Sequence, residues 1–173
     1  PDHVNSDLLN FFKEINDKHF IFSVDDFFPI RHINHNIINI FEELITKQNI
    51  SRIALNGHVK TKPYDVISKH EDFDIIELSQ LADYRKSAVW SIWSKEYFIK
   101  YLNNSSNLWE WELDESCKND NHRILGSIRS YAIQACHLMK RGKLKSDWYK
   151  DSEGSDIMYY DDMNKLKSII SYE

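Results

Sequence analysis

Residues 34–48 constrain the fold more than any other stretch, because they predict an amphipathic helix between two short apolar segments. Their apolar residues recur at helical spacing on one face, and their charged residues fall on the opposite face. The segments at 20–24 and 52–55 are rich in aromatic and β-branched residues, which is typical of buried strands. A strand, a helix and a second strand in this order predict a crossover. We therefore expect an α/β fold whose mixed, at least partly parallel sheet is flanked by helices.

The rest of the chain predicts further elements around this unit. Helical spacing and strand-like composition indicate helices at 7–18, 95–103, 108–115 and 161–170, and strands at 73–78, 88–93, 124–128 and 131–138. Asp7 is the expected N-cap of the first helix. The polar stretch 56–72 is expected to be a loop, followed by a strand at the edge of the sheet. Because no repeat or linker divides the chain, we expect one domain over residues 1–173.

Composition excludes several classes of protein. The net charge of −5 gives no electrostatic reason to expect nucleic acid as a partner. Only 4 glycines are present, so neither a dinucleotide fingerprint nor a Walker loop is available. No apolar run reaches the length of a transmembrane helix. Cys117 and Cys136 have neither the spacing of a metal site nor the density of a disulfide scaffold, so a reducing, cytoplasmic setting is expected.

Two adjacent carboxylates, Asp25 and Asp26, directly follow the apolar segment at 20–24. One interpretation is a strand that leaves the core and enters a turn, with Pro29 ending the ladder. The other is a site for a hard cation, since carboxylate oxygens are preferred ligands of Mg, Mn and Ca. Ligands of open α/β sheets bind at the C-terminal ends of strands, which is where these two residues lie.

A second group of acids lies in the predicted helix at 108–115, where Glu110, Glu112 and Asp114 alternate with Trp109 and Trp111. They are interpreted either as a solvated helix face or as a source of a catalytic base. Burial of Glu112 beside tryptophan would raise its pKa toward that of a base. The two tryptophans are either core residues or a platform for a sugar ring.

Two further polar residues have alternative roles. Arg85, which follows Tyr84, is suited either to clamp a phosphate or carboxylate or to form a structural salt bridge. His137 follows a predicted strand and is a candidate metal ligand. His32 and His35 are expected to be surface or capping residues, since no third ligand completes a zinc set with them.

Taken in order, five short motifs resemble those of small bacterial and viral glycosyltransferases of the GT-A type, which are often linked to surface polysaccharide synthesis. The motifs are I-F-S-V-D-D-F-F at 21–28, Y-R-K-S at 84–87, I-W-S-K-E-Y-F at 92–98, N-L-W-E-W-E at 107–112 and M-K-R-G-K-L at 139–144. The resemblance covers residues 7–148. It implies a GT-A-like, Rossmann-like fold.

The resemblance also implies roles for particular residues. Asp25 and Asp26 match the acids that hold Mn²⁺ or Mg²⁺ together with a nucleotide-diphospho sugar, and His137 matches a late metal ligand. The metal would neutralise charge on the leaving diphosphate. Tyr84 and Arg85 would lie along the donor or acceptor pocket.

Glu112 matches the general base that deprotonates a hydroxyl of a glycan or lipid-linked acceptor, which would give inversion by direct displacement. Asp114 and Glu110 are the alternatives for that role. In the family, strands that build the base-binding half of the nucleotide site precede the first helix. This chain begins at that helix, so the resemblance implies an N-terminally truncated form of the fold. Two other functions remain open: a non-catalytic binding module, and another Mg-dependent enzyme such as a phosphohydrolase or nuclease.

Overall fold

The computed structural model describes residues 4–25, 27–57, 59, 63–102, 107–137, 139, 140, 143 and 144. The chain divides into two compact units. The first comprises Pro1–Val24 and Asn34–Ala132, and the second comprises Asp25–Ile33 and Ile133–Glu173.

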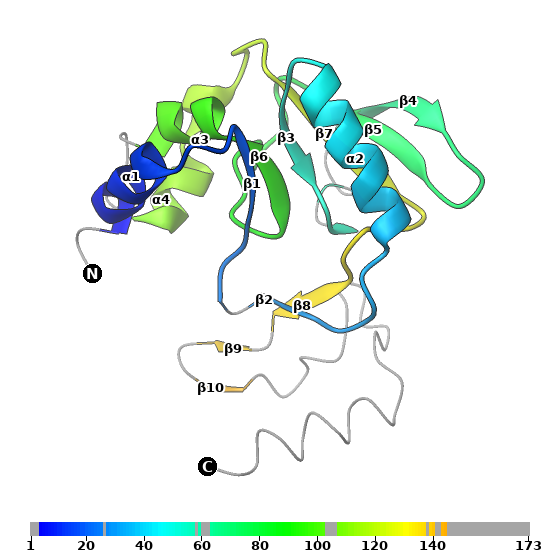
Figure 1. Ribbon diagram of the computed structural model, residues 1–173, viewed down its shortest axis with the longest axis horizontal. Coiled ribbons are helices and arrows are strands. Elements are labelled where there is room, and N and C mark those ends of the chain that lie inside the picture. Colours follow the sequence, from blue (N-terminus) through cyan, green and yellow to red (C-terminus); the bar gives the residue numbers. More distant parts are fainter. Residues whose placement is uncertain are drawn as a thin grey trace. The chain divides into compact units, whose positions relative to one another are not determined.

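The first unit contains a mixed, open sheet of six strands in the order β1-β6-β3-β7-β5-β4 (Figure 1). The strands are β1 (His19–Phe22), β3 (Ile50–Ala54), β4 (Tyr64–Lys69), β5 (Asp74–Leu78), β6 (Ser91–Ser94) and β7 (Arg123–Ile128). β3 and β7 pair in parallel, and the other neighbours pair antiparallel. Because β6 lies between β1 and β3 and is antiparallel to both, β1 and β3 run in the same direction. The expected α/β fold with a mixed sheet is confirmed.

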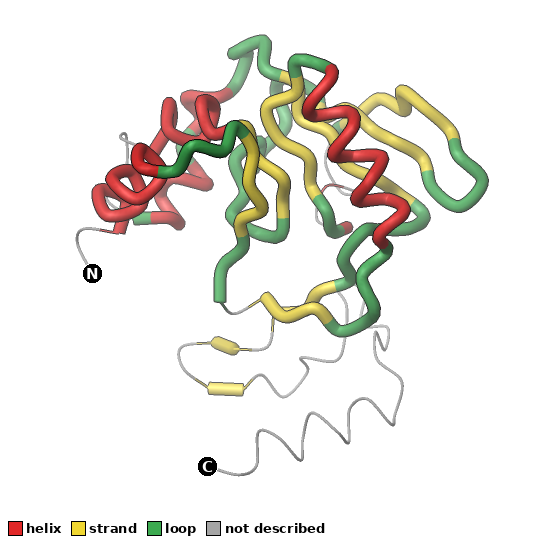
Figure 2. The backbone as a smooth tube through the Cα atoms, viewed as in Figure 1, coloured by secondary structure: helices red, strands yellow, loops and turns green. Residues whose placement is uncertain are grey.

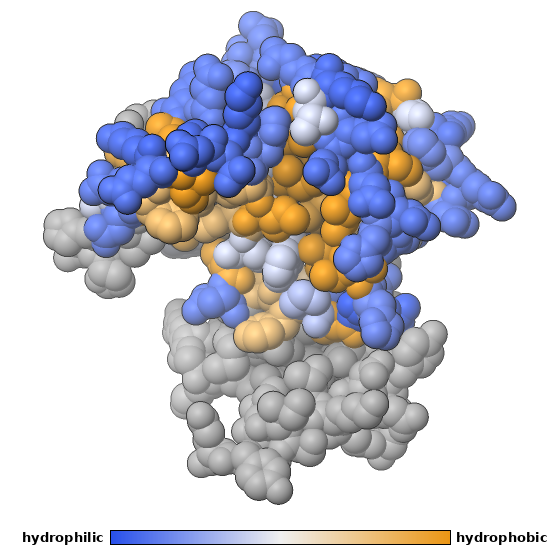
Figure 3. All heavy atoms as spheres, viewed as in Figure 1, coloured by the Kyte–Doolittle hydropathy of each residue, from blue (hydrophilic) through white to orange (hydrophobic). Residues whose placement is uncertain are grey.

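Helices flank this sheet. They are α1 (Val4–Glu14), α2 (His35–Lys47), α3 (Lys95–Leu102) and α4 (Leu108–Leu113), and the 3₁₀ turn η2 (Glu115–Cys117) follows α4. Asn34 caps α2, because its side chain accepts a hydrogen bond from the Ile37 N–H. The helix buries Ile37, Phe41 and Ile45 and contacts β3. Its outward side is hydrophilic, as Figure 3 shows. The amphipathic helix predicted between two strands is therefore present.

Three local predictions are wrong. The region expected to be a loop contains β4, which forms a hairpin with β5 (Figure 2). Nearly every β4 residue is exposed, so the strand has no alternation of apolar and polar residues to reveal it. β5 is not an edge strand, because β4 and β7 pair with its two sides. Asp7 lies in the first turn of α1 rather than at its N-cap, since the helix begins at Val4.

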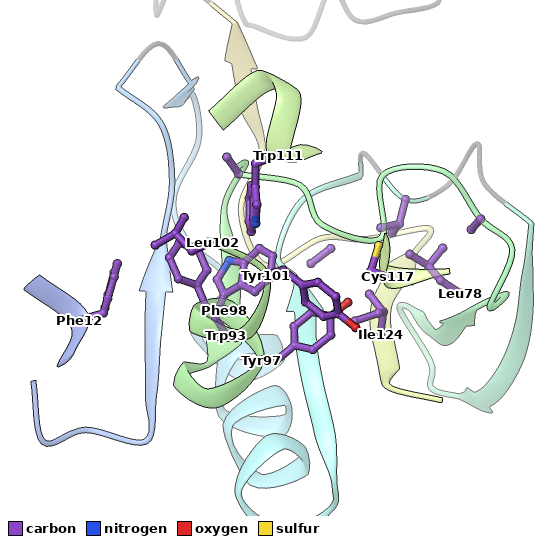
Figure 4. Close-up of a cluster of buried hydrophobic side chains, with 14 of the residues drawn as sticks. Phe12, Leu78, Trp93, Tyr97, Phe98, Tyr101, Leu102, Trp111, Cys117 and Ile124 are labelled. Atoms are coloured by element: carbon purple, nitrogen blue, oxygen red, sulfur yellow. The ribbon is translucent and has the colours of Figure 1, made fainter. Parts of the chain in front are cut away.

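An aromatic core joins α1, α3 and α4 to one face of the sheet. Trp93 from β6 packs against Phe98 of α3 at 5.1 Å and Trp111 of α4 at 5.5 Å, measured between ring centroids. Phe12 of α1 reaches Phe98 at 4.9 Å. Figure 4 shows these rings gathered together. Because Trp93 and Trp111 are completely buried, the core fixes α4, and with it the predicted acids, against β6.

The second unit contains two small antiparallel pairs in its described part. β2 (Phe27–Pro29) pairs with β8 (Ala135–His137), and β9 (Met139–Lys140) pairs with β10 (Lys143–Leu144). The predicted helix at 161–170 lies outside the described residues. None of the helices in the described ranges is long and apolar enough to span a membrane.

Candidate functional site

Arg85 is a structural centre of the first unit. Its guanidinium is completely buried and donates hydrogen bonds to the carbonyls of Cys117, Ser79 and His122, at 3.0, 3.0 and 2.6 Å. It also forms an ion pair of 3.0 Å with Asp120. These contacts tie the segment before β6 to the turn that precedes β7. Of the two roles predicted for Arg85, the geometry favours the structural salt bridge.

A second buried guanidinium, that of Arg52, contacts the same segment. Arg52 of β3 donates to the carbonyls of Tyr84 and Arg85, at 3.2 and 3.0 Å, and lies over the Trp93 ring. Burial lowers the pKa of Arg52 to about 10, which leaves the group charged at neutral pH. Tyr84 has a φ of 55°, a left-handed conformation that is uncommon for a residue with a side chain. The carbonyl contacts with Arg52 help to hold this unusual turn.

Lys86 is the third buried cation. Its ammonium group is 2.7 Å from the carboxylate of Asp114 and lies near the Tyr101 and Trp111 rings, at 5.2 and 5.8 Å from their centroids. The Lys86 side chain is 0% exposed, whereas that of Asp114 is 31% exposed. Asp114 ends α4 and caps η2, and it also accepts hydrogen bonds from Ser116. The ion pair therefore fixes the C-terminal end of α4.

Glu112 is held in place by the capping of α4 and by a backbone contact with Ala88. Asn107 caps α4 by accepting the Glu110 N–H at 2.9 Å, and the buried Trp111 anchors the helix. The Glu112 carboxylate is partly buried and accepts the backbone N–H of Ala88 through Oε1. α4 thus directs Glu112 back toward the segment that contains Tyr84.

A pocket of about 180 Å³ opens between these segments. It is lined by residues 82–84 on one side and by 112–115, 117 and 118 on the other. The structure therefore brings together three of the predicted site residues, namely Tyr84, Glu112 and Asp114. Glu110 does not line this pocket and is exposed.

Two of the carboxylates that line the pocket, Glu112 and Asp114, are predicted site residues and differ in chemistry. Burial tends to raise the pKa of Asp114, but hydrogen bonds from Lys86 and Ser116 outweigh it, and the pKa is lowered overall. A carboxylate with a lowered pKa is a weaker base at neutral pH. Glu112 has no lysine hydrogen-bonded to it among the described residues, so it is the better candidate for a base.

The predicted metal residues lie in the second unit. Antiparallel pairing of β2 with β8 places Phe27 opposite His137, so the backbone of His137 pairs with the residue that directly follows Asp26. Asp25 is an exposed turn residue, and Asp26 lies outside the described residues. Within the described part of the chain, no group of three or more His, Cys, Asp and Glu side chains is arranged to hold a metal ion.

Sequence reasoning missed the residues that complete the pocket. Lys118 forms ion pairs with Asp83, at 2.9 Å, and with Glu115, at 2.7 Å, and so bridges the two sides of the rim. The role of Lys86 was also missed, although the residue is part of a quoted motif. The signal in the sequence was the basic pair Arg85–Lys86 shortly before a predicted buried strand, because a buried lysine needs an oppositely charged partner.

Comparisons of this chain with protein-family models, with curated proteins and with solved structures find no match.

Proposed function

We propose that this chain is a metal-dependent glycosyltransferase that moves a sugar from a nucleotide-diphospho-sugar donor to an acceptor hydroxyl. Glu112 is the base that deprotonates this hydroxyl. The observation that carries the proposal is the pocket. Tyr84 lies 28 residues before Glu112 and 30 before Asp114 in the sequence, yet all three line one pocket. That convergence is what the resemblance to GT-A-type enzymes leads one to expect of an acceptor site.

In the proposed reaction, Glu112 removes the proton of the acceptor hydroxyl. The acceptor oxygen forms a bond to the anomeric carbon as the bond from that carbon to the diphosphate oxygen breaks. The nucleoside diphosphate leaves with the bonding electrons, and the proton remains on Glu112. Direct displacement of this kind inverts the anomeric configuration. The Ala88 N–H orients the carboxylate for this step.

Asp25, Asp26 and His137 are the residues that would hold the divalent cation. The two carboxylates are donors that suit Mn²⁺ or Mg²⁺. The pairing of Phe27 with His137 supports this set, because it puts the backbone of His137 opposite the residue that directly follows Asp26 in the sequence. The cation would supply positive charge to stabilise the leaving diphosphate.

Thermal melting tests donor binding. A ligand that binds the native state stabilises it and so raises the melting temperature. At a concentration of 100 times Kd, the ligand adds about 2.7 kcal/mol to the free energy of unfolding. We expect one of the UDP-, GDP- or dTDP-sugars to raise it in the presence of Mn²⁺, and Asp26→Asn to remove the Mn²⁺-dependent part. If no nucleotide sugar shifts the melting temperature with either Mn²⁺ or Mg²⁺, the proposal is wrong. Donor binding without any transfer would instead identify a binding module.

A further inference from the structure

The pocket beside Glu112 carries an excess of negative charge. Four carboxylates lie on its lining, from Asp83, Glu112, Asp114 and Glu115. Three cations oppose them, since Lys118 pairs with Asp83 and Glu115, Lys86 pairs with Asp114, and the buried Arg52 guanidinium attracts Glu112. The carboxylates on the lining therefore outnumber these cations by one. An anionic ligand in the pocket would therefore be repelled by carboxylates close to it.

An exposed apolar strip continues the pocket along α4. Trp109 and Leu113 are one helical turn apart, so they lie on the same side of the helix. Their exposed fractions are 69% and 46%, and Leu113 also lines the pocket. Trp111, two positions from Trp109, is completely buried in the core. Trp111 is thus a core residue, whereas Trp109 is the tryptophan whose ring is exposed to a ligand.

The size of the pocket limits what it can hold. A volume of about 180 Å³ is below the roughly 300–1,000 Å³ of pockets for drug-sized ligands. It suits a single ring with polar substituents rather than a whole nucleotide sugar. Carboxylates accept hydrogen bonds from hydroxyl and ammonium groups, and the neighbouring indole offers an apolar face for a ring.

From these features we infer that the pocket and the Trp109–Leu113 strip form an acceptor subsite that takes a neutral or amino sugar and excludes acidic sugars. This inference rests on the proposed function and adds the charge class of the acceptor. The diphosphate of the donor would meet the same repulsion, so it is not the group that this subsite holds. An amino sugar gains a further contact, since its ammonium group is attracted to an indole face.

Titrations with three methyl glycosides, followed through the backbone amide signals of residues 82–84 and 109–118 by NMR, test the inference. The probes are the methyl glycosides of glucose, glucosamine and glucuronic acid. We expect the first two to shift these signals and the glucuronide to bind at least about tenfold more weakly, which is the scale of charge repulsion across a few ångströms of partly solvated protein. Raising the salt concentration should reduce the difference in affinity between the glucuronide and the other two glycosides, because salt screens the repulsion.

Two pairs of variants test whether a change in glycoside binding comes from the pocket itself or from any change at the protein surface. Trp109→Ala should weaken binding of the neutral glycoside, whereas Phe11→Ala, which removes an exposed aromatic ring from α1, should not. Glu115→Lys should improve binding of the glucuronide. Glu43→Lys is its matched control, because Glu43 is similarly exposed and pairs with a lysine four residues later, as Glu115 pairs with Lys118 three residues later.

The inference is overturned if the glucuronide binds as tightly as the glucoside, or if no glycoside shifts the pocket signals. Melting with the donor on the same protein then tells the two failures apart. A stabilising donor without a glycoside effect removes only the acceptor subsite, whereas loss of both removes the proposed function as well.

Discussion

The buried ion pair between Lys86 and Asp114 predicts an unequal response to loss of its two partners. Lys86 is completely enclosed, whereas Asp114 is 31% exposed and keeps its hydrogen bonds from Ser116. Asp114→Ala therefore strands a buried charge, which typically costs about 3–5 kcal/mol of unfolding free energy. We expect about 3 kcal/mol, because the Tyr101 and Trp111 rings still face the ammonium group.

Lys86→Met should cost only about 1 kcal/mol, since methionine fills similar space and the remaining carboxylate reaches water. The double variant should then resemble Lys86→Met alone, with a coupling of about 3 kcal/mol between the two sites. Urea denaturation monitored by tryptophan fluorescence measures all three free energies. Asp83→Ala, which removes an exposed partner of Lys118, serves as a control that leaves stability nearly unchanged.

Equal losses for Lys86→Met and Asp114→Ala would refute this reasoning, because they would show that burial does not set the cost. The effect also depends on pH. The pKa of Asp114 is lowered in the folded protein, so its stabilising contribution is present above the ordinary aspartate value. That contribution is lost as the pH falls through the lowered folded pKa.

Three further predictions follow from other contacts. Arg85→Met should lower the unfolding free energy by about 3–5 kcal/mol in urea denaturation, because it leaves Asp120 buried without its cation; a loss below 1 kcal/mol would contradict the structural role. Gly126→Ala should cost about 1–3 kcal/mol in the same assay, since its Cβ would lie 2.6 Å from Val59 Cγ2, and an unchanged midpoint would contradict that packing. The pKa of His122 is lowered by burial and by Lys100, so its NMR titration should lie below 6.5 and move upward in Lys100→Met; a titration above 6.5 would count against this environment.

The sequence predicted features that depend on local patterns. The helix at 34–48 was found because burial of one face leaves a periodic trace, and its neighbouring strands followed from their composition. β4 was missed because its residues are exposed on both faces and leave no such trace. Whether Trp109 or Trp111 enters the core depends on how α4 packs against β6, which spacing alone does not specify.

The candidate site was predictable only in part. Tyr84 and Glu112 were named from their motifs and Asp114 as an alternative acid on the same predicted helix, and the structure places them around one pocket. The partner of Lys86 lies 28 residues away in sequence, and the acceptors of Arg85 are mainly backbone carbonyls. Such contacts arise from the fold and have no signature in a single sequence.

Release of nucleoside diphosphate from a nucleotide sugar, measured with Mn²⁺ and a neutral acceptor glycoside, tests the role of Glu112 most directly. The native chain should release it, and Glu112→Gln should be slower by about 10²–10⁴-fold while its donor-induced rise in melting temperature is retained. Unchanged turnover in Glu112→Gln, or no release by the native chain with any donor that binds, would contradict the account.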